Sequence, residues 1–307
     1  MNELVCNQLT KVYEGKKTAL NSVTFSIPTS GIFALIGRNG AGKTTLIRIL
    51  ATELEPTTGT ATINGLDVVK EAKRLREEIA IVPQEARTMP WLTPKQTVLS
   101  YLLWRGFGYS EAKKTSDESL RRMGLEKYAN TLNRKISGGT KRKVLMATVL
   151  ASESRILFLD EPTSGLDPIS RKEFWEILQD FGKDRFIFLT THYLEEAASL
   201  ADRIGILSEG QLLAADSLQG LRAKVNYEYS IKIPSSATLP ENPEGEITRG
   251  KDGSTQILTD EETAKTISVS MLKQGTRFSI SPVSLDDIFF RMVGREAEER
   301  VVEEDKN

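Results

Sequence analysis

Cysteine and histidine are nearly absent from this chain of 307 residues, in which each occurs only once, as Cys6 and His192. A single cysteine cannot form an internal disulfide, and one residue of each type cannot supply the ligands of a structural zinc site. We therefore expect a protein of a reducing compartment, in which Cys6 is a small strand residue rather than a nucleophile.

Long apolar runs and an excess of one charge are also missing. The formal net charge is -1, so no basic field favours nucleic acid as a partner. The apolar runs at 155–160 and 185–190 are too short to span a bilayer, and the first residues lack the basic-then-apolar pattern of a signal peptide. With 39% hydrophobic and 27% charged residues, the composition predicts a soluble globular protein.

The first part of the chain alternates between strand and helix patterns. Strands are expected at 3–13 and 19–27, with a turn at Gly15, and a hairpin segment at 57–65. Between them, a short apolar run at 32–37 leads through a glycine-rich loop into a helical pattern at 44–50.

A mostly helical segment at about 86–150 follows, and then two buried strands at 155–160 and 185–190 with an amphipathic helix at 168–181 between them. This pattern predicts an α/β domain over residues 1–218 that carries a helical insertion.

The pattern changes near residue 219, after which we expect a small accessory α+β domain over 219–294 and a charged tail over 295–307. The tail is interpreted as a frayed helix or a disordered segment. The expected elements of the accessory domain are a strand at 227–233, a loop at 234–245, a hairpin from 246–249 and 254–259, a helix at 261–275, a strand at 277–281 and a helix at 285–293.

The glycine-rich loop has the full spacing of a Walker A phosphate loop. Its glycines let backbone N–H groups converge on phosphate oxygens, Lys43 can reach the β- and γ-phosphates, and the Thr44 hydroxyl can bind Mg²⁺. The helix that follows presents its positive end to the phosphates. The loop therefore predicts a nucleoside triphosphate site formed by Gly37, Arg38, Asn39, Gly40, Ala41, Gly42, Lys43, Thr44 and Thr45.

Two carboxylates stand at the end of the buried strand at 155–160, Asp160 as its last residue and Glu161 directly after it. Asp160 is placed to hold Mg²⁺ through water, and Glu161 to polarise the water that attacks the phosphate. An apolar strand that ends in Asp-Glu is weak evidence alone, because such acids often cap a helix. Its value comes from the other motifs around it.

Ser137-Gly138-Gly139 stands about twenty residues before this strand. With the Walker A loop and the acidic strand in the same order, the chain over residues 3 to about 218 resembles the ATP-binding cassette (ABC) ATPases. The resemblance implies a P-loop NTPase cassette with a RecA-like core, an antiparallel β subdomain and a helical subdomain, joined to the small C-terminal α+β domain. It also implies ATP and Mg²⁺ as cofactors.

The resemblance assigns further roles residue by residue. Tyr13 stands where the family stacks an aromatic ring on adenine, and Gln84 stands in the loop that contacts Mg²⁺ and the attacking water. Asp167 ends the loop that crosses the dimer, and His192 follows a buried strand as the switch histidine that touches the γ-phosphate. The implied catalytic set is Glu161, His192, Gln84 and Lys43, and the implied metal set is Thr44, Gln84 and Asp160.

Ser137-Gly138-Gly139 and the residue after it correspond to the family's signature loop, which here has Thr140 where glutamine is usual. The run from Gly138 to Lys143 is similar to the branch of drug and antibiotic exporters that includes daunorubicin exporter ATPases.

The resemblance to the ABC ATPases implies a head-to-tail dimer in which Ser137, Gly138 and Gly139 of one copy complete the ATP site of the other. It also implies a transmembrane permease partner and a cytoplasmic location on the inner face of the membrane. Trp91, Tyr101 and Trp104 are candidates for docking the permease or for core packing.

Two other functional classes stay open at this point. One is a soluble ABC mechanoprotein of translation or DNA repair. The chain has one cassette and no sustained heptads, whereas translation-type members usually carry two cassettes and repair-type members carry long coiled coils. The other is a regulatory or drug-sequestering nucleotide-binding protein. The transported substrate is not encoded in these motifs, because in this architecture the membrane subunit selects it.

Overall fold

The computed structural model describes residues 2–15, 17–235, 244–250 and 252–304, with 295–304 described as backbone only. The chain divides into two compact units, Met1–Ala215 and Asp216–Asn307. The sequence placed this boundary at residue 218, and the structure places it after Ala215. Among the described residues, no helix is both long enough and apolar enough to cross a membrane.

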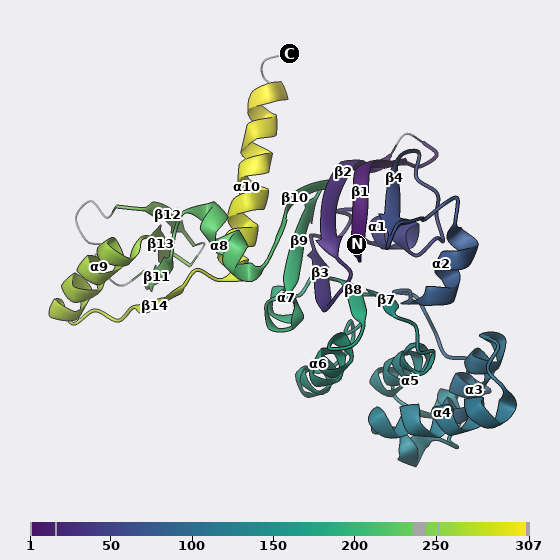
Figure 1. Ribbon diagram of the computed structural model, residues 1–307. Coiled ribbons are helices and arrows are strands. Elements are labelled where there is room, and N and C mark those ends of the chain that lie inside the picture. Colours follow the sequence, from purple (N-terminus) through teal and green to yellow (C-terminus); the bar gives the residue numbers. More distant parts are fainter. Residues whose placement is uncertain (1, 16, 236–243, 251, 305–307) are drawn as a thin grey trace. The chain divides into compact units, whose positions relative to one another are not determined.

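A six-stranded sheet forms the centre of the first unit (Figure 1). The strands β9, β3, β8, β7 and β6 are parallel neighbours in that order. Their carboxyl ends therefore lie at one edge of the sheet. At this edge β3 leads into the phosphate loop, β7 ends at Asp160, β8 leads to His192 and β6 leads to Gln84. Loops at the carboxyl edge of such a sheet are where ligands bind in open α/β folds. The strand order is β10 (Gln211–Asp216), β9 (Arg203–Ser208), β3 (Ile32–Ile36), β8 (Phe186–Thr191), β7 (Ile156–Asp160) and β6 (Ile79–Val82).

A row of phenylalanines fixes the register of three of these strands. Phe33 lies opposite Phe188, and Phe188 lies opposite Phe158. Their ring centroids are 5.0 and 5.8 Å apart, and all three side chains are fully buried. Burying such a side chain stabilises a fold by about 1.5–3 kcal/mol, so a slip of one residue would be strongly disfavoured.

An antiparallel sheet packs against the same core. Its strand order is β2 (Thr18–Pro28), β1 (Glu3–Val12), β4 (Thr58–Ile63) and β5 (Leu66–Asp67). Alternate residues of β1 and β2 are buried with the apolar face of α1 (Lys43–Leu50). Phe25 of β2 stacks on Phe33 at 6.0 Å and so ties this sheet to the central one. Helix α2 (Ala72–Glu78) leads into β6.

The helical segment expected at 86–150 consists of α3 (Pro94–Trp104), α4 (Tyr109–Arg122) and α5 (Gly138–Ala151), which are grouped together in Figure 1. It begins later than the sequence suggested because Thr93 caps α3: the Thr93 hydroxyl accepts from the Gln96 N–H, and the Gln96 side chain accepts from the Thr93 N–H. Helices α6 (Pro168–Gly182) and α7 (Leu194–Leu200) follow β7 and β8.

The second unit contains a four-stranded antiparallel sheet with α9 (Glu261–Lys273) packed on it. The strand order is β12 (Glu246–Arg249), β13 (Thr255–Thr259), β11 (Tyr229–Ile233) and β14 (Ser279–Pro282). Its core comprises Ile231, Ile233, Ile257, Ala264, Ile267 and Met271. Helix α8 (Leu218–Val225) precedes the sheet.

Helix α10 (Leu285–Glu304) includes residues 295–304, which the sequence assigned to a tail. Residues 236–243 of the expected loop, Lys251 of the expected hairpin turn and 305–307 of the tail lie outside the described residues.

Candidate nucleotide-binding site

The phosphate loop joins β3 to α1 along a path that only glycine can follow at two positions. Gly42 has φ 106°, and a Cβ there would lie 2.4 Å from the Ala19 carbonyl oxygen. A Cβ on Gly37 would lie 2.4 Å from the Leu207 carbonyl oxygen. The two glycines therefore allow the loop to pack against neighbouring backbone while it turns into the helix.

Lys43 is folded back over its own loop. Its Nζ donates to the carbonyl oxygens of Gly37 at 2.8 Å and Arg38 at 3.2 Å, and it lies 3.8 Å from Glu161 Oε1. Burial lowers the pKa of Lys43, and the carboxylates of Glu161 and Asp160 oppose that shift. The ammonium group therefore lies at the point where the loop meets the acidic end of β7.

Three side chains from three different segments surround the Glu161 carboxylate. Besides Lys43, the Gln84 amide donates from Nε2 to Glu161 Oε2 at 3.0 Å. His192 Nδ1 lies 3.2 Å from Glu161 Oε1. Each of these residues follows a neighbouring strand of the sheet or opens α1, so the parallel topology brings them together. Glu161 itself is 7% exposed.

Thr190 holds the acidic end of β7 in place. Its hydroxyl donates a short hydrogen bond to Asp160 Oδ1 and accepts from the Glu161 backbone N–H at 3.1 Å. Asp160 is 1% exposed, so its carboxylate is buried. Glu161 has φ 48°, in the left-handed region that a side chain adopts only when its surroundings fix it.

A cavity of about 400 Å³ opens over the phosphate loop. Tyr13 lines it, with its hydroxyl 3.3 Å from the Thr45 hydroxyl and Lys11 Nζ 5.6 Å from the ring centroid. Gly37, Arg38 and Ala41 of the predicted loop, together with Asp160 and His192, are not among the lining residues. The lining residues are Tyr13, Lys17, Ala19, Asn39, Gly40, Gly42, Lys43, Thr44, Thr45, Gln84 and Glu161.

The other predicted site residues do not line this cavity. Ser137 is the N-cap of α5, where its exposed hydroxyl accepts from the Thr140 N–H at 3.2 Å; Gly138 and Gly139 form the first turn. Asp167 caps α6 by accepting from the N–H groups of Ile169 and Ser170. The Ser170 side chain, followed by the Ser170 N–H, holds the pKa of Asp167 below its usual value.

Two residues of the site were missed by the sequence analysis. Thr190 is a polar residue at the end of an apolar strand, and that contrast is a usable signal. Arg142 lies within the signature run but was read only as part of a family pattern. In the structure it is buried and bonds to the backbone on both sides of Glu161. Arg142 is the fifth residue of α5, and nothing in the sequence indicates that its side chain reaches the backbone around Glu161.

Comparison with known proteins identifies the class of this site. A family model described as "ABC transporter" matches residues 20–164. The chain is 31% identical to the daunorubicin/doxorubicin resistance ATP-binding protein DrrA of Streptomyces peucetius, over 96% of this chain and 94% of that protein. It is 33% identical to human ATP-binding cassette sub-family A member 2 over 78% of this chain, but it spans only 10% of that much longer protein. It likewise spans 26% of ABC transporter A family member 7 of Arabidopsis thaliana, at 32% identity over 78% of this chain.

Solved structures show the same fold. A dimeric bacterial ABC transporter cassette, also solved with ADP and phosphate, matches with TM-score 0.65 and 25% identity, over 70% of this chain and 98% of the cassette. A Clostridium perfringens cassette that is part of an ABC transporter complex matches with TM-score 0.63 and 26% identity, over 73% of this chain and 94% of that one. These matches confirm the predicted fold class. The chain therefore belongs to the ABC transporter family, as an ATP-binding and ATP-hydrolysing cassette.

Proposed function

We propose that this chain is the ATPase subunit of an exporter, which works as a head-to-tail dimer and drives a separate transmembrane subunit. The observation that carries this proposal is the convergence of Lys43, Gln84 and His192 on the Glu161 carboxylate. Phosphoryl transfer needs mainly positioning and charge neutralisation, and these four side chains supply both. Support for export comes from the relative that carries a drug-resistance name.

Each side chain has a distinct role in this proposal. Glu161 is the general base that takes a proton from the attacking water, and Gln84 positions that water. Lys43 and His192 neutralise charge on the transferred phosphoryl group. The Tyr13 ring, at the rim of the cavity, stacks on adenine.

The residues present fit Mg²⁺. Thr44 and Gln84 offer oxygen atoms at the cavity wall, and the buried carboxylate of Asp160 at the end of β7 would hold the ion through water. Among the described residues no group of three or more His, Cys, Asp and Glu side chains is suited to a metal. This agrees with Mg²⁺, which uses few protein ligands and retains water and phosphate oxygens. When bound, the ion would neutralise phosphate charge.

The geometry of α5 supports a second copy as the missing half of the site. Ser137 is exposed, and a Cβ on Gly138 would meet no atom of this chain within 4 Å. The N-terminus of this fourteen-residue helix therefore has open space before it, with N–H groups suited to an anion. We infer that the γ-phosphate of the other copy's ATP lies there, with Asp167 near the same dimer contact.

An exposed apolar group on the helical segment supports a membrane partner. Met89, Trp91 and Trp104 are 54%, 68% and 79% exposed, and Leu103 is 41% exposed. Tyr101 is only half-buried and contacts Trp104, with ring centroids 6.1 Å apart. Exposed aromatic side chains gathered on one segment mark interaction sites. We propose that this group docks a permease and holds the subunit at the inner face of the membrane.

Co-expression of the full chain with a candidate polytopic membrane protein, followed by co-purification, tests this function. We expect complex formation with the natural chain and its loss in Trp91→Ser/Trp104→Ser, while hydrolysis by the free subunit is retained. Val69→Ser, which alters a single exposed apolar residue on another segment, is the matched control and should bind normally. Undiminished binding by the double variant, or no binding by the natural chain, contradicts the proposal.

A further inference from the structure

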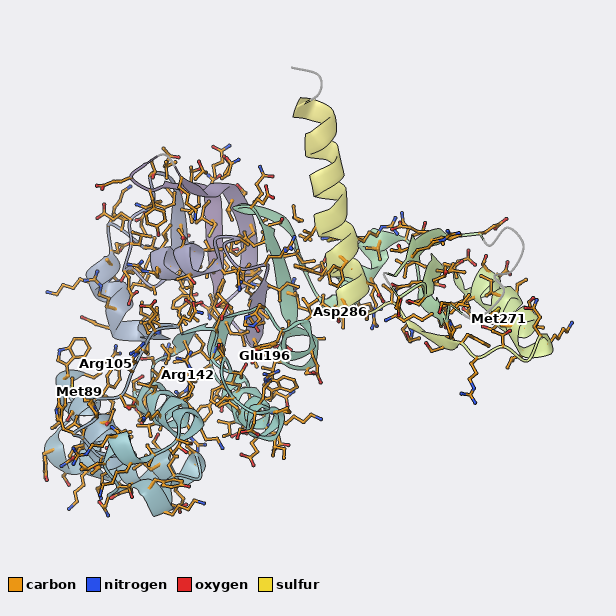
Figure 2. The ribbon with its side chains drawn as sticks, turned by 180° about the vertical axis from the view of Figure 1, so that it is seen from behind. Met89, Arg105, Arg142, Glu196, Met271 and Asp286 are labelled. Atoms are coloured by element: carbon orange, nitrogen blue, oxygen red, sulfur yellow. The ribbon has the colours of Figure 1, made fainter. Side chains whose placement is uncertain are left out.

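Arg142 of α5 directs all of its guanidinium N–H groups at backbone carbonyl oxygens. Nε donates to Pro162 at 3.0 Å, and Nη2 donates to Asp160 at 2.9 Å and Glu161 at 3.0 Å. Nη1 donates to Pro83 at 3.3 Å and Gln84 at 3.4 Å. Arginine has five such donors, and here each finds a separate carbonyl. The residue is 9% exposed, and Figure 2 labels it between the strands and the helices.

The five acceptors belong to two loops that carry proposed catalytic side chains. Asp160 ends β7 and Glu161 and Pro162 follow it, while Pro83 and Gln84 follow β6. One rigid, planar guanidinium therefore fixes the spacing between the Gln84 backbone and the Glu161 backbone. The hydrogen bond between the two side chains, at 3.0 Å, depends on that spacing.

The backbone of Glu161 needs support from both sides. Its φ of 48° is costly for a residue with a side chain and persists only where neighbours fix the peptide groups on each side. Thr190 accepts from the Glu161 N–H with both its carbonyl oxygen and its hydroxyl. On the other side, the Glu161 carbonyl oxygen accepts from Arg142. Thr190 and Arg142 thus hold the two ends of the same residue.

We propose that Arg142 is a positioning residue for ATP hydrolysis, which sets the Glu161 carboxylate and the Gln84 amide in place through their backbones. Because Arg142 lies on the helix that begins at Gly138, the position of the signature loop and the geometry of the hydrolytic centre are mechanically linked within one chain. The positioning role of Arg142 requires only that the chain hydrolyses ATP. The link between the signature loop and the hydrolytic centre matters only if the proposed dimer forms.

Arg142→Lys is the sharpest variant because it keeps the positive charge. A lysine offers three donors on a flexible stem and cannot satisfy five carbonyl groups. Arg185→Gln is the matched control. Arg185 also donates to a carbonyl of α5, at Leu150 and 2.9 Å, but at the opposite end of the helix.

The experiment measures kcat, the Kd for ATP, the melting temperature and amide hydrogen exchange of segments 83–85 and 160–163 on the full chain. For Arg142→Lys we expect kcat to fall on the order of 10- to 100-fold, as for other residues that orient a catalytic group through a hydrogen bond. The Kd for ATP should change by less than about threefold, because the phosphate loop is untouched. Exchange should be faster in both segments.

For Arg185→Gln we expect a kcat within about twofold of the natural chain, whatever its melting temperature. An unchanged kcat with unchanged exchange in Arg142→Lys overturns the proposal. A fall in kcat that Arg185→Gln reproduces at equal loss of melting temperature also overturns it, because the role would then be purely structural. If the natural chain hydrolysed no ATP, the ATPase assignment would fail, while the exchange measurement would still decide whether Arg142 holds the two loops.

Discussion

Thr190 holds the backbone N–H of Glu161 with two acceptors, its own carbonyl oxygen and its hydroxyl, each at 3.1 Å. The same hydroxyl donates to the Asp160 carboxylate. One buried side chain on β8 therefore organises both acidic residues at the end of β7. The relation exists because β7 and β8 are parallel neighbours in which Asp160 lies opposite Thr190.

Replacing Thr190 by valine removes the hydroxyl and keeps the shape of the side chain. The Asp160 carboxylate then loses a buried donor, which costs about 1–3 kcal/mol. We expect the free energy of unfolding to fall by that amount in urea titrations, and kcat to fall with it. Thr148→Val is the control, since its buried hydroxyl only donates back to the Val144 carbonyl oxygen within α5. Equal stability of the two variants would argue against the role given to Thr190.

Ser137→Arg tests the composite site. The arginine should block the surface that faces the second copy's nucleotide, so we expect hydrolysis to stop while ATP still binds with normal affinity. Lys43→Ala should fail for the opposite reason, because its own phosphate loop is impaired. Mixing the two inactive variants should restore measurable activity, since a mixed dimer has one intact site. Full activity of a dimer made only of Ser137→Arg chains would refute the sandwich arrangement.

Glu196 of α7 provides a test of pH dependence. It is fully buried, accepts from Trp175 Nε1 at 3.1 Å, and is labelled in Figure 2. Burial raises the pKa of its carboxyl, while the neighbouring polar side chains of Thr191, Thr163 and Trp175 and the charge of Arg171 oppose the shift. The folded state therefore favours the protonated form, which is lost as the pH rises through the raised pKa.

Glu196→Gln should consequently gain stability relative to the natural chain as the pH rises from about 4.5, the ordinary range of a glutamate, and the difference should level off above the raised pKa. Urea unfolding at a series of pH values measures it. Glu195→Gln, an exposed neighbour, should show no such trend. A stability difference between Glu196→Gln and the natural chain that is constant with pH would contradict the inferred pKa shift.

Much of the site could be predicted from sequence because its parts are motifs with fixed local geometry. The phosphate loop is recognised from glycine spacing, and the acidic pair from its place after an apolar strand. Strands that are not part of a motif were missed. The sequence did not predict β6, β9 and β10, although β6 leads to Gln84 in the site. β6 has only four residues, and β10 has a single buried residue, so their patterns are weak alone and become clear only through pairing.

The contacts of Arg142 and Thr190 could not be predicted for a different reason. Arg142 contacts backbone carbonyl groups, and Thr190 contacts the backbone N–H of Glu161 besides the Asp160 carboxylate. Every sequence possesses such backbone groups, and no residue type marks which of them will be contacted. Likewise, the motif alone does not show that Ser137 is absent from the lining of the cavity in its own chain. The sequence shows which side chains are present, whereas the topology decides which of them meet.

Glu161→Gln is the direct test of the general base. The amide keeps the size of the carboxylate but cannot take a proton from water. We expect ATP to bind and the rate of hydrolysis to fall about 10²–10⁴-fold, the usual contribution of a positioned base. Phosphate release at saturating ATP measures this rate. Rapid steady-state hydrolysis by this variant would remove Glu161 from the role.

The same variant tests the central claim, that each chain holds half of two shared ATP sites. In the proposed dimer, unhydrolysed ATP stays between the two cassettes. Light scattering on Glu161→Gln should therefore give the mass of two chains with saturating ATP, and this assembly should be lost with ADP or when Ser137→Arg is added. A mass at saturating ATP that equals the mass with ADP would contradict the account.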